Sequence, residues 1–427
     1  MGKLRAQSAY PVQILMQHIA IDARMYGTAQ RGIGRYLVKL IQGLEEIESA
    51  PHPLLTSPIP APEQVRYGAG KGEETIQNSP PLVGGVRGGE NQYTIFLRRA
   101  NFEEYIPHNP NFKKALWDVP WYGWREQFTR YTLHATRYTL FHFPHWNVPL
   151  FFNRPFVVTI HDLELFSSNR TRENSTRGRL MYYLKHLAFR IIFRHAVLAA
   201  RAIIVPSNFV REQLLDMYPS VRKKVRVVYE APTITPTVRY TLHATRYTPY
   251  ALYVGAAYPH KNLPRLIDAW QILHEKLPDH KLVLVGREDF FWHRLKTTHY
   301  KLLTTPSIVF YGSATDAELA VLYKNAALLV QPSLEEGFSL SPLEALSFGT
   351  PVAASDIAVH REILKDAAHY FNPTDTNSIA SAIIGALSDP TSRIRAQQEG
   401  PELLKRYSWH THTKETLAIY QASMQTV

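Results

Sequence analysis

The 427-residue sequence contains no cysteine and no uninterrupted apolar run long enough to cross a membrane as a helix. The first absence excludes disulfides and thiolate metal sites, and it suits a reducing compartment. The opening segment, residues 1–24, has neither the apolar core nor the small-residue cleavage site of a secretory signal. We therefore expect a protein of the cytoplasm.

Motifs for metal and nucleotide binding are also missing. The sequence has no H-E-x-x-H, no Asp-x-Asp and no P-loop, and the nearest approach is Asp162-Leu163-Glu164. A bound phosphate would then be neutralised by lysine, arginine and helix N-termini instead of by a cation held by carboxylates. We expect neither a metal ion nor a cofactor.

The net charge of +12 is concentrated in the first part of the chain, where residues 151–250 carry 16 Lys and Arg against 6 Asp and Glu. Such a surface suits an acidic ligand, an anionic membrane or nucleic acid. No nucleic-acid-binding module accompanies the charge, so we expect no nucleic acid partner. Segment 176–202 mixes cations with large apolar residues at helical spacing. It is interpreted either as a core helix with solvated cations or as a helix at the inner face of a membrane.

Short apolar runs alternate with helical stretches in both halves, which predicts parallel sheets covered by helices. The expected α/β fold has two Rossmann-like domains that face one another across a cleft. The expected strands of the first domain are near 18–23, 93–98, 139–144, 156–161, 202–206 and 225–229. Those of the second are 251–255, 282–286, 308–312, 327–333 and 351–355.

This alternation divides the chain into an N-terminal domain, a linker, a C-terminal domain and a helix that returns to the first domain. Their predicted bounds are 1–235, 236–249, 250–408 and 409–427. Residues 50–91 are dense in Pro and Gly and are predicted to be a low-complexity insertion. The segment RYTLHATRYT occurs at 130–139 and again at 239–248, and two copies are too few for a repeat architecture.

Two carboxylates near the C-terminal domain's fourth strand form the most informative pattern. Glu336 begins a Gly-containing turn, where backbone N–H groups can face a ligand, and Glu344 lies in the first turn of the helix that follows. This layout suits a nucleotide sugar. Ser341-x-x-Glu344, with Pro342 at the first helical position, is also a capping box by itself, so both interpretations stay open.

Further candidates follow other predicted strands. Gly32 and Gly34 precede a helical run, where phosphate binds well, although a Gly pair also serves tight turns. Lys261 follows Gly255 in a second strand–loop–helix pattern and suits a diphosphate, although most lysines are solvated. His161 ends an apolar strand and should emerge at a sheet edge, either for chemistry or to cap a turn.

Seven ordered segments resemble the retaining glycosyltransferases of family 4, which have the GT-B fold. The most specific is EGFSLSPLEALSFG, residues 336–349. The others are IDARMYGTAQRGIGRYL, HFPHWNVPLF, VVTIHDL, IIVPSNFVREQL, YVGAAYPHKNLPRLI and RYSWHTHTKETLAIY. HFPHWNVP and YPHKNL resemble the mannosyltransferase-type members most.

The resemblance implies roles for the matched carboxylates and for the turn between them. Glu336 would contact hydroxyls of the donor sugar, and Glu344 would accept from the ribose hydroxyls. The backbone amides of Gly337, Phe338 and Ser339 would line the sugar-phosphate pocket.

The resemblance also assigns the remaining candidates. Lys261 would hold the diphosphate, Gly32 and Gly34 would let it approach the first domain, and His161 would lie beside the transferred sugar. Gly255 would begin the diphosphate loop, but Ala256 follows it where many members carry Arg, which puts the full phosphate clamp in doubt.

The implied activity is the transfer of a hexose, with mannose suggested by the resemblance, from a nucleotide-diphosphate sugar to a glycan or lipid-linked acceptor. Retention of anomeric configuration and independence of metal ions are part of this expectation. The alternatives are a sugar-nucleotide epimerase and a non-catalytic sugar-nucleotide-binding homologue; a basic nucleic-acid-binding protein fits the sequence less well.

Overall fold

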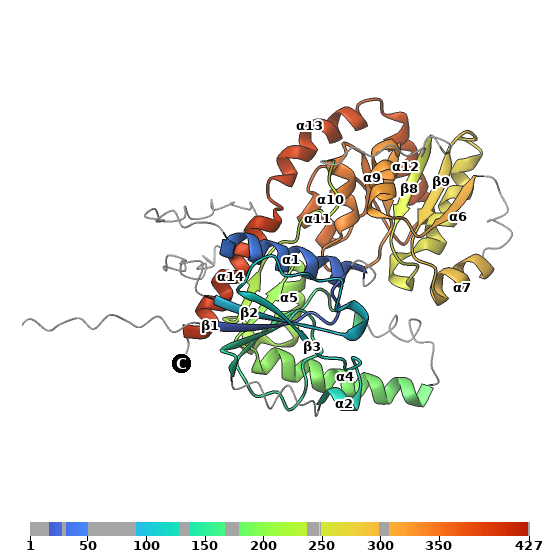
Figure 1. Cartoon of the computed structure of the whole chain (residues 1–427). Coiled ribbons are helices and arrows are strands. Elements are labelled where there is room, and N and C mark those ends of the chain that lie inside the picture. The colour runs from blue at the N-terminus through green and yellow to red at the C-terminus, as the bar shows by residue number, and fades with distance from the viewer. Residues whose placement is uncertain are drawn as a thin grey trace, which may run out of the picture.

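The computed structural model describes residues 17–27, 31–49, 91–127, 137–166, 179–236, 247, 249–298 and 307–425. Figure 1 shows two α/β units that pack against one another. All but the last residue of the predicted insertion at 50–91, most of the linker at 236–249 and most of both RYTLHATRYT copies lie outside the described residues.

The first unit is a seven-stranded parallel sheet with strand order β3-β2-β1-β4-β5-β6-β7. Its strands are β1 (Gln17–Asp22), β2 (Asn91–Leu97), β3 (Phe112–Leu116), β4 (Leu140–Phe143), β5 (Phe156–Thr159), β6 (Ala202–Val205) and β7 (Val225–Val227). Its helices include α1 (Arg31–Ser49), α2 (Trp124–Gln127), α4 (Arg179–Ala199) and α5 (Asn208–Met217). One core packs side chains of α1 against the sheet, and a second packs side chains of α4 and α5 against it.

The second unit is a six-stranded parallel sheet with strand order β10-β9-β8-β11-β12-β13. Its strands are β8 (Tyr250–Val254), β9 (Lys281–Val285), β10 (Ile308–Gly312), β11 (Leu328–Gln331), β12 (Val352–Ser355) and β13 (Ala368–Phe371). Its helices include α6 (Leu263–His274), α7 (Phe290–Thr298), α9 (Asp316–Asn325), α10 (Leu340–Ser347), α11 (Ala358–Leu364), α12 (Thr376–Ser388) and α13 (Ser392–Leu404). The predicted fold of two Rossmann-like sheets is confirmed.

Two strands were missed by the sequence analysis, and both lie near or at an edge of a sheet. β3 reads FKKAL and only its first residue is buried, while β13 reads AHYF and only its last is buried. A strand with one neighbour is partly solvated, so it does not need the continuous apolar run of a central strand. The apolar pattern therefore revealed the inner strands and two of the four edge strands, β7 (VRV) and β10 (IVFYG), but not the other two.

The last helix, α14 (Trp409–Gln425), lies beside α1 on the first sheet, as Figure 1 shows. Leu417 and Tyr420 are buried in the core that α1 also forms. The Tyr420 hydroxyl is hydrogen-bonded to His142 Nδ1, and Arg201 donates to the Ser423 carbonyl at 2.6 Å. The chain thus crosses from the second unit back to the first before it ends.

Candidate functional site

A small cavity lies where the two units meet. The first unit contributes residues that follow β5, together with one residue of α5. The second contributes residues that follow β8 and β11. The carboxyl ends of parallel strands are where open sheets bind ligands. The lining residues are Asp162, Leu163, Glu164, Gln213, His260, Lys261, Glu335, Glu336 and Gly337.

Lys261 and Glu336 form an ion pair in this cavity. Lys261 Nζ donates to both carboxylate oxygens of Glu336 at 2.7 Å. Gln331 and Ser333 donate to Glu336 Oε1 at 2.9 and 2.7 Å. Burial opposes ionisation of Glu336, but Lys261 and these donors lower its pKa to about 2. Ionised Glu336 thus stabilises the fold above its ordinary pKa of 4.5, and this contribution is lost as pH falls toward 2.

Gly337 brings the two units into backbone contact. A Cβ placed on Gly337 would overlap the carbonyl oxygen of His161 and lie 2.9 Å from its carbonyl carbon. Ser207, which caps α5 of the first unit, donates to the Gly337 carbonyl at 2.7 Å. Glycine is therefore required here because the first unit occupies the space that a side chain would need.

The His161 ring is held away from the cavity by partners on both nitrogens. Its Nδ1 lies 2.9 Å from Glu230 Oε1, and its Nε2 lies 3.0 Å from the Pro144 carbonyl. Burial opposes protonation, but Glu230 outweighs it and raises the pKa of His161. The stability from this charge is present below the ordinary value of 6.5 and is lost as pH rises through the raised value. Only the backbone of His161 reaches Gly337.

Glu344 is not a helix cap, so the capping-box interpretation is wrong. Its carboxylate accepts from Thr233 Oγ1 at 2.7 Å and from the Tyr323 hydroxyl at 2.8 Å. The Ser341 hydroxyl bonds to the Val254 carbonyl instead of capping α10, which begins one residue before it. Glu344 is buried and does not line the cavity.

The other residues of the turn pack tightly. The Phe338 ring is buried near Tyr229 and Tyr407. Ser339 is the N-cap of α10, with a positive φ of 79° and its hydroxyl 3.2 Å from His360 Nε2. Neither residue lines the cavity, whereas Gly337 does. Their predicted role as amide donors stays a prediction.

The predicted glycines Gly32, Gly34 and Gly255 do not line the cavity. Gly32 and Gly34 are in the first turn of α1, so the expectation of a loop that precedes the helix is wrong. The Gly255 amide donates to the Val285 carbonyl at 3.0 Å, so it already has a partner. The structure thus brings Lys261, Glu336 and Gly337 together.

The sequence analysis assigned no role to several residues of the site. His260 Nδ1 lies 2.5 Å from Glu164 Oε1, an ion pair that joins the two units when the imidazole is protonated. Glu230 holds His161. Glu230 and Glu164 both follow strands at the carboxyl edge, and that position was a usable signal. The pairing of His260 with Glu164 depends on how the two domains pack, so the sequence carried no signal for it.

Two sequence families match consecutive parts of the chain. Residues 87–231 match the family described as Glycosyltransferase Family 4, and residues 244–403 match the one described as Glycosyl transferases group 1. Both families are glycosyltransferase families, and the chain is a glycosyltransferase. Sucrose-phosphate synthase from Thermosynechococcus elongatus has the same fold as this glycosyltransferase, with a TM-score of 0.67 and 18% identity over 95% of this chain and 98% of that one. The GT-B fold is thereby shown.

Mannosyltransferases are among the relatives of this glycosyltransferase. It is 28% identical to the O-antigen chain mannosyltransferase RfbU of Salmonella typhimurium over 58% of this chain and 66% of the relative. It is 30% identical to the phosphatidyl-myo-inositol mannosyltransferase of Mycobacterium leprae over 38% of this chain and 43% of the relative. The chain thus spans about two thirds or less of these relatives.

Clusters of metal ligands and membrane-spanning helices are both absent from the described residues of this glycosyltransferase. Within the described ranges, no three His, Asp or Glu side chains are placed to share a metal ion. No helix in the described part of the chain has both the length and the apolar character needed to cross a membrane.

Proposed function

We propose that this glycosyltransferase transfers mannose from a nucleotide-diphosphate donor to a glycan or lipid-linked acceptor, with retention at the anomeric carbon and without a metal ion. The observation that carries the proposal is the Lys261–Glu336 pair in the cavity between the sheets. The names of the relatives, mannosyltransferases of an O-antigen chain and of phosphatidyl-myo-inositol, support the sugar and the acceptor class.

The pair explains how the site accommodates a donor. In the closed cavity, Lys261 neutralises Glu336. A donor diphosphate offers Lys261 two negative charges, so we infer that the ammonium turns to the leaving phosphate and frees the Glu336 carboxylate for hydroxyls of the sugar. Lys261 then stabilises the charge that grows on the diphosphate as the glycosidic bond breaks. The low pKa keeps Glu336 an acceptor throughout the neutral range.

We predict that the protein consumes GDP-mannose in the presence of EDTA and releases an α-linked product. In this mechanism Lys261 neutralises the negative charge on the leaving group. Chelation of divalent metal ions should therefore change the rate of transfer less than twofold. The rate of product formation with added EDTA tests independence of metal ions. The coupling constant at the anomeric carbon of the product, measured by NMR, tests retention. Strict dependence on a divalent ion contradicts the first, and a β-linked product contradicts the second.

Helix α4 supports contact with an anionic membrane. Four large apolar side chains on it are about half exposed: Tyr183, Leu184, Leu187 and Ile191. At about 100° per residue they share one side of the helix with the exposed Arg190 and Arg194. Phe189 and Phe193 are buried on the opposite side. The helix therefore packs on the sheet and still presents an apolar, basic face, which is the composition of a membrane-surface helix.

We predict salt-sensitive binding of the protein to vesicles that contain an anionic lipid. Replacing both Arg190 and Arg194 by Glu should weaken co-sedimentation by about tenfold or more, since each cation near an anionic surface contributes about 1 kcal/mol. The matched control is Lys276→Glu with Arg294→Glu, the same charge change at exposed positions of the second unit. Equal binding to neutral vesicles, or equal loss in the control, would contradict a role for α4.

A further inference from the structure

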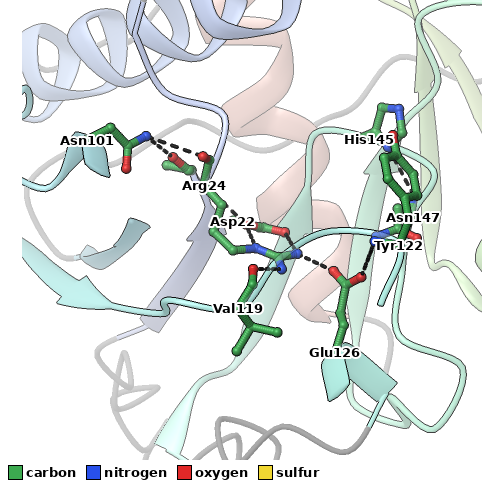
Figure 2. Close-up of polar contacts among 9 residues, drawn as sticks. Asp22, Arg24, Asn101, Val119, Tyr122, Glu126, His145 and Asn147 are labelled. Atoms are coloured by element: carbon green, nitrogen blue, oxygen red, sulfur yellow. Dashed lines mark hydrogen bonds and ion pairs between the residues drawn. The ribbon is translucent and has the colours of Figure 1, made fainter. Parts of the chain in front are cut away.

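A buried ionic cluster supports the carboxyl edge of the first sheet, outside the donor cavity (Figure 2). The Arg24 guanidinium is buried and donates to both oxygens of Asp22 at 2.8 and 2.7 Å and to Glu126 Oε1 at 2.5 Å. Glu126 Oε2 accepts from Asn147 Nδ2 at 2.7 Å and from the Tyr122 backbone N–H at 3.0 Å. The cluster thus fixes two residues that carry no charge.

Asn147 is left with an unused acceptor. Its side-chain N–H is committed to Glu126, while its buried Oδ1 has no donor among the described residues. Asn147 is only 4% exposed. A buried amide oxygen without a partner is costly unless a ligand or water supplies the hydrogen. Asn147 therefore points to a bound group with an O–H or N–H.

His145 supplies the complementary donor. Its Nδ1 accepts from the Asn147 backbone N–H at 3.3 Å, so in the neutral ring the hydrogen is on Nε2. Burial and the neighbouring cations His161 and Arg24 lower the pKa of His145 to about 3, which keeps the ring neutral. His145 Nε2 thus offers a donor and Asn147 Oδ1 an acceptor, and the hydroxyl groups of a sugar can satisfy both kinds of group.

Tyr122 adds an aromatic surface in a strained conformation. Its backbone φ is 62°, a region that favours glycine, yet its side chain is 56% exposed. The ring lies 6.0 Å from His145 and 5.4 Å from Trp146, measured between centroids. The contact between Glu126 and the Tyr122 backbone N–H holds Tyr122 in this strained conformation. Backbone strain of this kind occurs often at ligand-binding positions.

We propose that Tyr122, His145 and Asn147 form a subsite for a neutral pyranose of the acceptor, an inference that rests on the proposed glycosyl transfer. Sugar hydroxyls donate to Asn147 Oδ1 and accept from His145 Nε2, while an apolar face of the ring packs on Tyr122. The subsite adjoins the donor cavity, because Asp162, which lines that cavity, lies close enough to Tyr122 to add to the effect of desolvation and raise the pKa of its hydroxyl group. The nearby carboxylates of Asp22, Glu126 and Asp162 disfavour an anionic sugar.

Direct binding of p-nitrophenyl α-D-mannopyranoside, followed by saturation-transfer NMR, tests the subsite without requiring turnover. The variants are Tyr122→Gly, which suits the positive φ, and His145→Phe, which keeps a ring but removes both nitrogens. We expect each to weaken binding about tenfold, the loss of one good contact. Phe290→Ala is the matched control, because the Phe290 ring is 54% exposed and lies on the second unit. GDP-induced thermal shifts and melting curves of the variants should match those of the unmodified protein.

The outcomes separate the subsite from the proposed function. Weaker pyranoside binding in Tyr122→Gly and His145→Phe, with GDP binding intact, supports the subsite. Unchanged binding in both variants overturns it, even if GDP-mannose is turned over. Equal binding of p-nitrophenyl β-D-glucuronide overturns the preference for a neutral sugar. Failure to consume any nucleotide sugar overturns the proposed function, and pyranoside binding then still reports on the subsite.

Discussion

Lys261→Ala is expected to lower kcat for transfer by about 100- to 1,000-fold, the usual effect of losing one donor that meets developing charge. In the unliganded cavity, Lys261 contacts Glu336 through both carboxylate oxygens at 2.7 Å. When a donor binds, the Lys261 ammonium group in the cavity can form an ion pair with the diphosphate. Steady-state transfer from GDP-mannose, with a melting curve for each variant, measures the effect.

The double variant Lys261→Ala with Glu336→Gln separates chemistry from stability. Removing Lys261 alone leaves the buried Glu336 charge without its cation, which costs on the order of 3 kcal/mol. The added Glu336→Gln change removes that charge, so the melting temperature should recover while transfer stays low. Recovery of transfer together with stability would show that Lys261 serves the fold only. Near-normal turnover in Lys261→Ala would also contradict its assigned role.

Gly337→Ala is expected to abolish measurable transfer while each sheet stays folded. The added methyl group would overlap the His161 carbonyl oxygen, a backbone atom that cannot move aside cheaply. The two units would have to separate, which breaks the Ser207–Gly337 hydrogen bond and opens the cavity. Catalysis that depends on positioning typically loses about 100-fold for a displacement of about 1 Å.

Gly385→Ala is the matched control for this substitution. Gly385 lies in α12, and a Cβ placed there meets nothing within 4 Å. Alanine in a helix interior stabilises by about 0.5–1 kcal/mol, so this variant should keep full activity and melt slightly higher. Small-angle scattering should show a larger radius of gyration for Gly337→Ala alone. Full activity of Gly337→Ala would show that the closed arrangement is not the reactive one.

The sequence by itself determined the inner strands of both sheets, the edge strands β7 and β10, and the identity of the family. Central parallel strands are buried on both faces, so runs such as those of β6 and β11 are apolar throughout. It also placed Lys261 and Glu336 at carboxyl ends of strands, since both follow such runs within a few residues. The edge strands β3 and β13 were not predicted, because solvent contacts part of their surface and their sequences are therefore less apolar.

Only the tertiary structure decided what the candidate side chains contact. Glu344 forms a perfect capping box in sequence, yet Thr233 and Tyr323 take its carboxylate, because the chain between the units packs onto α10. His161 was predicted beside the sugar, but Glu230, 69 residues later, holds its ring. Hydrogen bonds between distant segments depend on how the sheets pack, and a short sequence motif does not determine that packing. The same holds for Asn147, whose unused oxygen became visible only once Glu126 was seen to bind its amide nitrogen.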